Sequence, residues 1–402
     1  MDATSNLSTD ALQNYLRQVA ARTGLFLRAY AFPIALFVFL RVWDSVWAYL
    51  VENWTAATRP ELMFGLTPIT QGIAGVLWGP WLRWDTVWYV KIATQGYSNT
   101  NLTPAFFFLY PLLIKLFAAV VGDPVGAGVL LASGAALVSF ILLYRFMREV
   151  QGKGVARATL LFLAVFPSAF FLFAAYTESL FLAFALGAIM AARARRWELA
   201  GVCGALAAMI RPQGLVFFLP LAVEFVLQYR SGQVALRRVW TVGLTLLGGL
   251  VPFLFLTFQF GSPQIWFATQ ARWHYTVMPW ESLGEVWWVV FHAPTVLDAI
   301  RSFPDAFFAV LFLGFLVWSA FRLSPTLTVY MAIIVLPPLF ARSTYEPDFP
   351  LASMSRYVLL AFPAFLLLGR LRWRRWQAPL LAVSFLVQTL GLVLFVVWVF
   401  VG

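Results

Sequence analysis

The sequence predicts an all-α integral membrane protein with many spanning helices. Of its 402 residues, 62% are hydrophobic and 11% are charged, and the mean hydropathy is +0.82. A soluble domain of this size carries about a quarter charged residues, and the shortage here follows from the cost of placing a charge in lipid. Soluble and disordered proteins are therefore excluded. The net charge of +11 points to basic cytoplasmic loops rather than to nucleic acid.

Apolar stretches long enough to cross a bilayer recur along the whole chain, since a span needs about 20 mostly apolar residues. Residues 1–28 are polar and have no apolar core, so we expect a cytoplasmic N-terminal segment without a cleavable signal peptide. Residues 29–402 then form a single multi-spanning domain of about 11 helices. The expected spans are 29–51, 125–147, 155–175, 178–194, 198–213, 214–230, 239–260, 306–322, 325–341, 356–370 and 378–401.

One further apolar stretch, residues 105–121, decides the side on which every later loop lies. If it does not span and the N-terminus is cytoplasmic, eighteen Lys and Arg residues fall inside and nine fall outside, on longer loops. Counting it as a span would place most short basic loops outside, against the positive-inside rule. The charge pattern therefore predicts an amphipathic helix in the outer interface over this stretch, and an outer C-terminus.

This topology makes the two sides chemically different. The inner loops are short and basic, whereas the outer side carries the long segments 52–124 and 261–305, both rich in Trp, Tyr and Phe. Long loops in compact proteins are usually functional or disordered, and such an aromatic composition is not typical of disorder. We therefore expect the functional site on the outer face, with interfacial helices in the first outer loop.

Asp85 is the candidate catalytic residue of the first outer loop. Helical spacing from Asp85 to Ala93 places Asp85, Trp88 and Tyr89 on one face, and Gly96 is a plausible stop. A carboxylate beside tryptophan near the headgroups is placed to accept a proton. The alternative is an aspartate that caps an interfacial helix, and the spacing alone does not separate the two.

Four further outer residues are candidates for binding a phosphate or an acceptor. Arg211, Arg356 and His274 could contact a phosphate, because a guanidinium binds phosphate in a bidentate way. The alternatives are an arginine that snorkels to headgroups, a topology anchor and a solvated loop histidine, respectively. Glu178 either orients an acceptor or forms a structural ion pair with an arginine.

Several separated motifs, in order along the chain, resemble the PIG-V family of mannosyltransferases. Trp84-Asp85 is followed by Tyr89, by Gly96-Tyr97 and by Leu109-Tyr110-Pro111. The later matching positions are Tyr176-Thr177-Glu178-Ser179-Leu180-Phe181, Arg211-Pro212, Gly214, Gln270, Trp273, Trp280, Ser353, Ser355, Arg356-Tyr357 and Phe362-Pro363. Position 108 is Phe where relatives often have Pro. The resemblance covers roughly residues 30 to 370.

The resemblance implies a GT-C membrane glycosyltransferase, which takes a sugar from a polyprenyl-phosphate carrier on the outer or lumenal side. It implies transfer with inversion, Asp85 as the base, mannose as the sugar, and no metal or other cofactor. The substrate-binding residues that it implies, together with the candidates above, are Glu178, Arg211, Arg356, Tyr357, His274, Gln270, Trp273, Trp84, Tyr89 and Tyr110. For Trp273, stacking on a sugar and anchoring in the interface remain open.

Two other functions fit the same composition. A membrane transporter of a lipid-linked or small polar substrate often shows inverted repeats and charges at mid-membrane, and neither is evident here. A non-catalytic protein that binds lipid-linked sugar or scaffolds a partner would use nearly the same residues as an enzyme. The acceptor, a lipid or a glycan, stays open. In a bacterium the expected location is the plasma membrane.

Overall fold

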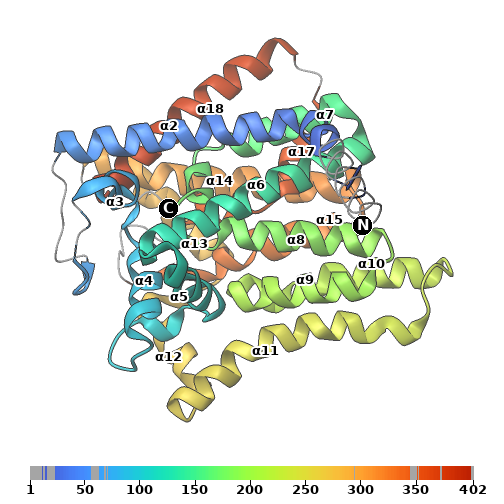
Figure 1. Ribbon diagram of the computed structural model, residues 1–402, viewed down its shortest axis with the longest axis horizontal. Coiled ribbons are helices and arrows are strands. Elements are labelled where there is room, and N and C mark those ends of the chain that lie inside the picture. Colours follow the sequence, from blue (N-terminus) through green and yellow to red (C-terminus); the bar gives the residue numbers. More distant parts are fainter. Residues whose placement is uncertain are drawn as a thin grey trace, which may run out of the picture.

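The structure is a computed structural model, which describes residues 11, 14–15, 23–55, 63–67, 69, 71–293, 295–344, 351, 353–371 and 374–399. Most of the expected N-terminal segment and part of the first outer loop lie outside these residues. The described part of the chain is almost entirely helical, and most helices run along one direction in Figure 1. The expected all-α architecture is confirmed.

Among the described residues, six helical stretches are long and apolar enough to cross a membrane. They confirm a multi-pass membrane protein, although they do not establish the expected number of eleven spans. The helices that contain them are α2 (Ala31–Thr55), α6 (Pro124–Gln151), α10 (Phe218–Arg230) with the preceding 3-10 turn η5 (Pro212–Val216), α11 (Trp240–Phe260), α14 (Val296–Arg322) and α18 (Arg374–Val396).

The first outer loop folds into short helices at the left end of Figure 1. Helix α4 ends at Gly96, whose φ of 82° suits glycine, as the spacing predicted. Helix α5 has 13 residues and is roughly 20 Å long, too short to cross about 30 Å of hydrocarbon. Its place in the interface stays a prediction. The elements are α3 (Gly72–Leu77), η2 (Gly79–Trp81), α4 (Asp85–Gln95), η3 (Thr103–Ala105) and α5 (Leu109–Val121).

The expected continuous span 155–175 is wrong. Helix α7 (Lys153–Ala164) stops before Pro167, and α8 (Glu178–Arg193) begins only after a buried irregular segment that includes η4 (Ala169–Leu172). Proline has no amide hydrogen and restricts the residue before it, so a helix usually ends there. Side chains satisfy the freed carbonyls, since Ser384 donates to Val165 O and Arg41 to Phe173 O.

The expected span 356–370 is also interrupted. It divides into α16 (Met354–Val358) and α17 (Phe362–Arg370), with Pro363 in the first turn of α17. The Tyr330 hydroxyl donates to the buried carbonyl of Leu360 at the break. Both broken regions therefore present non-helical backbone deep in the protein, which a membrane protein tolerates only where protein covers it.

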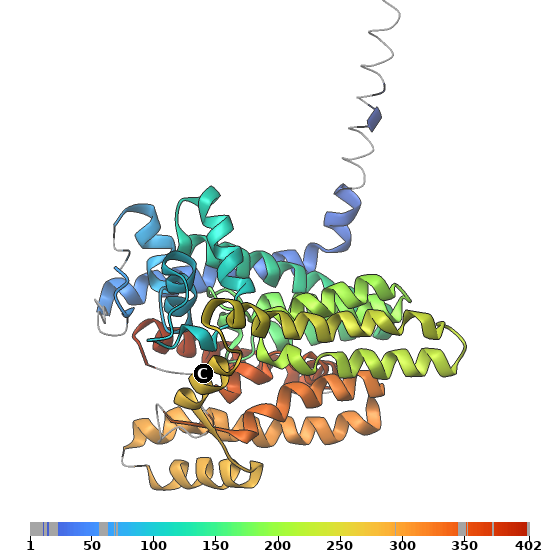
Figure 2. The same cartoon turned by 90° about the horizontal axis from the view of Figure 1, so that it is seen from below.

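The second outer loop joins the same end of the molecule. A two-stranded antiparallel sheet pairs β1 (His274–Thr276) with β2 (Ala341–Ser343), and Figure 2 shows α13 at the edge away from α3. The helical part of the expected span 325–341 ends at Val335, and Ala341 already belongs to the strand. The remaining elements are α9 (Trp197–Ile210), η6 (Leu236–Val239), α12 (Gln264–Trp273), α13 (Pro279–His292), α15 (Pro325–Val335) and η7 (Pro337–Phe340).

Candidate active site

Asp85 begins helix α4 directly after a strained residue. Trp84 has φ of 51°, a conformation that non-glycine residues rarely adopt, and it turns the chain into the helix. The Asp85 amide donates to the Tyr176 hydroxyl at 3.1 Å. The N-cap residue of α4 is Trp84 and not Asp85, and Asp85 Oδ2 accepts from Arg356 Nη1 at 2.8 Å. The structure therefore does not support the capping alternative.

Glu178 begins helix α8 at the end of the irregular segment, and it is fully buried. Its Oε1 lies 2.6 Å from Arg211 Nη1 and 3.2 Å from Arg356 Nε. Arg211 also donates to Thr177 Oγ1 at 3.0 Å. Glu178 thus forms the ion pair that the sequence left as one alternative, and it does so with two arginines from distant segments.

The four charged residues form one continuous chain of contacts, Asp85 to Arg356 to Glu178 to Arg211. Their side chains are 23%, 10%, 1% and 5% exposed, in that order. Two carboxylates balance two guanidinium groups, as buried charges require. We call this set the ionic chain. Asp85 is the most exposed member of the ionic chain.

Aromatic rings surround the two arginines of the ionic chain. The Arg356 guanidinium carbon lies 5.3 Å from the ring centre of Tyr176 and 5.5 Å from that of Tyr357. The Arg211 guanidinium lies 5.6 Å from the same Tyr357 ring. Such contacts stabilise a cation by about 0.5–2 kcal/mol each. Both arginines are therefore fixed parts of the interior, not chains that snorkel to headgroups.

His274 is half-buried in strand β1, close enough to Arg356 to feel its charge. Burial, and then the positive charge of Arg356, lower the pKa of His274 to about 4. The imidazole is therefore neutral at pH 7 and adds no third positive charge. The strand pairing of His274 with Ser343 brings it to this place.

Two predicted tyrosines lie one behind the other beneath the ionic chain. Tyr89 approaches Thr177 Oγ1 at 3.5 Å, and burial followed by the charge of Asp85 raises the pKa of Tyr89, so its hydroxyl stays protonated. Tyr110 packs edge-on against Tyr89 and donates to Gly128 O at 3.0 Å. Tyr110 is fully buried, so both of these contacts lie within the interior of the protein.

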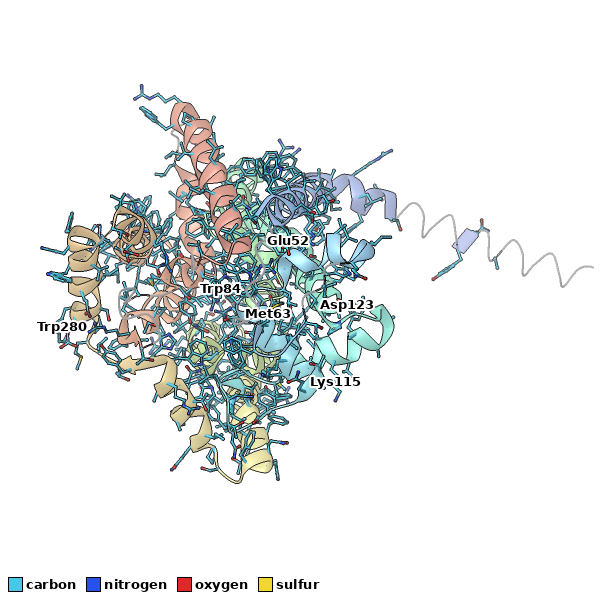
Figure 3. The ribbon with its side chains drawn as sticks, turned by 90° about the vertical axis from the view of Figure 1, so that its left-hand side faces the viewer. Glu52, Met63, Trp84, Lys115, Asp123 and Trp280 are labelled. Atoms are coloured by element: carbon cyan, nitrogen blue, oxygen red, sulfur yellow. The ribbon has the colours of Figure 1, made fainter. Side chains whose placement is uncertain are left out.

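Three other predicted residues join segments that are distant in sequence. Gln270 Nε2 donates to Ala105 O at 3.1 Å, and the Trp273 ring packs edge-on against Trp88. Both hold the second outer loop against the first. Trp84 packs against Trp398, and Figure 3 shows it near the middle of this end of the molecule, with Trp280 at the rim.

Sequence reasoning did not single out Tyr176, Thr177 and Arg83. The first two stand in the matched turn before Glu178, where only the fold shows that they hold Asp85 and Arg211. Arg83 is buried, pairs with Glu52 and donates to Val396 O. An arginine in an apolar, aromatic stretch was the available signal, since a buried charge needs a partner.

The fold and the site define a multi-pass helical membrane protein with a buried, charge-balanced cluster at one end. The family model described as mannosyltransferase (PIG-V) matches residues 36–336, which is most of the chain. The protein therefore belongs to the mannosyltransferase (PIG-V) family. Asp85, Glu178 and Arg211 lie inside the matched residues, whereas Arg356 and Tyr357 lie beyond them.

Two further similarities accompany the family match. The chain is 28% identical over 146 residues to GPI mannosyltransferase 2 of Schizosaccharomyces pombe, which is 34% of this chain and 31% of that protein. The similarity therefore spans less than a third of the relative's length. The structure also resembles the crystal structure of ArnT from Cupriavidus metallidurans bound to undecaprenyl phosphate, with a TM-score of 0.49 and 15% identity over 92% of this chain and 76% of that chain.

Proposed function

We propose that the protein transfers one sugar, mannose by family, from a polyprenyl-phosphate donor to a lipid or glycan acceptor on the outer face of the membrane. The observation that carries this proposal is the ionic chain, which sets a partly exposed carboxylate against a buried arginine. Family membership supports the sugar. The excess of basic residues on the short loops at the other end supports the outer face.

In the proposed reaction Asp85 is the general base. The acceptor oxygen attacks the anomeric carbon as Asp85 takes its proton, and the bond from that carbon to the phosphate oxygen breaks. Attack opposite the leaving group inverts the anomeric centre. A positioned base contributes about 10²–10⁴ in rate. Asp85 suits this part because it is the most exposed member of the ionic chain.

Arg356 is the proposed contact for the donor phosphate, with Arg211 behind it. The leaving phosphate gains the electron pair of the broken bond, and a guanidinium held beside it stabilises the added negative charge. Glu178 has little exposure, so its part is to hold both arginines rather than to touch the substrate. Tyr357 fixes the same two arginines from the other side.

Donor binding is proposed to release Asp85 from Arg356. The ionic chain is neutral without substrate, and Asp85 Oδ2 occupies the Arg356 Nη1 that a phosphate needs. A negatively charged phosphate therefore competes with Asp85 for this guanidinium. Once the phosphate has taken its place, the Asp85 carboxylate can turn to an acceptor hydroxyl. The base would thus become free only when a donor is present.

Changing Asp85 to Asn in the purified protein separates these ideas. We expect sugar transfer to fall about 100-fold or more, whereas polyprenyl phosphate should bind at least as tightly, because its competitor for Arg356 has lost its charge. Asp123→Asn is the matched control, since Asp123 lies at the same end (Figure 3) and caps α6. Near-normal transfer by folded Asp85→Asn protein would refute the proposed base.

Weaker binding of polyprenyl phosphate by Asp85→Asn would refute the competition between donor and base. Transport of the lipid-linked sugar without transfer by the reconstituted wild-type protein would point to a transporter. Binding of the donor without transfer or transport would point to a non-catalytic member of the family.

A further inference from the structure

We propose that Asp305 is a positioning residue that holds Arg356 in place for the donor phosphate. The inference rests on the proposed function of Arg356. Asp305 lies on α14 directly after Pro304, in a stretch long and apolar enough to span the membrane. An acidic residue is costly there, and Asp305 is buried. Its position requires an explanation that the ionic chain does not supply.

The Asp305 carboxylate binds the turn that leads into α16. Its Oδ1 accepts from the Ser355 amide at 2.8 Å. The backbone amides of Ser353 and Met354 also form hydrogen bonds with the carboxylate. Ser353 adopts φ of 79°, a left-handed conformation that lets successive amides point to one anion. One carboxylate therefore fixes three consecutive residues, whose buried amides would be destabilising without a hydrogen-bond acceptor.

The same turn fixes the backbone position of Arg356. The carbonyl of Ser353 accepts from the amides of Arg356 and Tyr357 at 3.1 and 2.9 Å. In addition, the Ser168 hydroxyl donates to Ser355 O at 2.9 Å. The turn is thus held by Asp305 from α14 and by Ser168 from the irregular segment before α8. Arg356 follows at once, and its guanidinium reaches Asp85 and Glu178.

The chemistry of the contact explains why a carboxylate is needed. Amides that converge on one group need oxygen acceptors, and a carboxylate offers two oxygens without a donor. In Asp305→Asn one of these becomes an NH₂ group that faces other N–H groups. The turn then loses part of its support, and Arg356 loses its fixed position. A guanidinium that must be ordered on binding contributes less to affinity.

The test measures binding of undecaprenyl phosphate to purified folded protein. We expect Asp305→Asn to weaken it about tenfold, and to weaken it no further in an Arg356→Ala background, because both changes remove the same contact. Glu224→Gln is the matched control: Glu224 accepts from Gln228 and Thr326 and joins α10 to α15. It should lower thermal stability without changing the dissociation constant.

Two results would overturn the inference: unchanged affinity in folded Asp305→Asn, or an effect that adds fully to that of Arg356→Ala. If the wild-type protein binds no undecaprenyl phosphate, the proposed function fails, and a second measurement still decides on Asp305. In that case the melting temperatures of Asp305→Asn, Arg356→Met and the double variant should be non-additive. The corresponding cycle with Glu224→Gln should be additive, and additivity for Asp305 as well would reject its coupling to Arg356.

Discussion

The two ends of the molecule use arginine in opposite ways. At the end that carries α4, Arg211 and Arg356 are buried and contact carboxylates. At the other end, Arg195 and Arg230 are exposed, and Arg370 donates to the carbonyl of Arg322. All of these arginines lie in or beside a helix terminus, so their place in the helices does not distinguish them. The buried acids at one end make the difference.

At the first end, both guanidinium groups are already paired with carboxylates before any substrate binds. A buried guanidinium with a carboxylate partner has lost most of its water, so a phosphate that displaces the partner meets a poorly hydrated cation. An exposed arginine attracts anionic headgroups only weakly, by about 1 kcal/mol. In the proposed function the first end therefore binds one phosphate specifically, and the second end is expected to orient the protein in the membrane.

Removing one arginine at each end should give the largest contrast. Arg211→Met leaves Glu178 with one partner fewer in a buried site, so we expect about 3–5 kcal/mol of lost stability and loss of sugar transfer. Arg230→Met, at the end of α10, should change both by little. Thermal unfolding in detergent and a transfer assay measure the pair of variants.

The double variant Glu178→Leu with Arg211→Met sharpens this contrast. Replacing a buried ion pair by apolar groups is often neutral for stability, so the melting temperature should largely recover while transfer stays lost. Equal effects of Arg211→Met and Arg230→Met would remove the distinction between the two ends.

Keeping the charge but changing its shape should give an intermediate effect. Arg356→Lys retains a cation beside Asp85 but cannot reach Asp85 through Nη1 and Glu178 through Nε at once, as Arg356 does. We expect affinity for polyprenyl phosphate to fall about tenfold, with the fold intact. Arg370→Lys at the other end should stay within twofold, and a similar loss there would show that bulk charge, not geometry, binds the lipid.

The last predicted effect appears only in acid and concerns the two histidines of the chain. The pKa of His274 in the folded protein, about 4, is below its ordinary value of 6.5, so the unfolded chain takes up a proton first as the pH falls. The stability that neutral His274 allows is thus present above pH 6.5 and is lost progressively toward pH 4. At about pH 5 the loss should be on the order of 2 kcal/mol.

His274→Gln should flatten this acid dependence of the melting temperature. His292→Gln, at an exposed position on α13, is the control and should leave the dependence unchanged. An identical acid profile for His274→Gln and the wild-type protein would show that His274 is not held neutral by its surroundings.

Much of this protein could be predicted from sequence alone, because the signals are strong and local. Apolar stretches of the length of a bilayer predicted the multi-helix membrane fold, and the spacing from Asp85 to Gly96 predicted α4 with its end. Ordered motifs predicted the family, which the family match confirms. The predicted site residues Asp85, Glu178, Arg211 and Arg356 do lie together, although their roles stay predictions.

Two expected spans are broken in the structure, and hydropathy does not predict such breaks. Hydropathy registers residues 155–175 and 356–370 as apolar, and it does not register that Pro167 and Pro363 lie at breaks in the helices. Whether an apolar stretch breaks depends on whether distant donors, such as Arg41 and Ser384, can satisfy the freed carbonyls. That question is answered only by the packed structure.

The sequence by itself thus determined the class of protein, and it predicted the side of the membrane that carries the site and the residue types of that site. The tertiary structure decided which carboxylate pairs with which arginine, because the pair of Asp85 and Arg356 joins positions 271 residues apart. It also decided that Asp305 accepts a hydrogen bond from the turn before Arg356. Composition and periodicity are local properties of the chain, whereas the partner of a buried charge is set by the packing of distant helices.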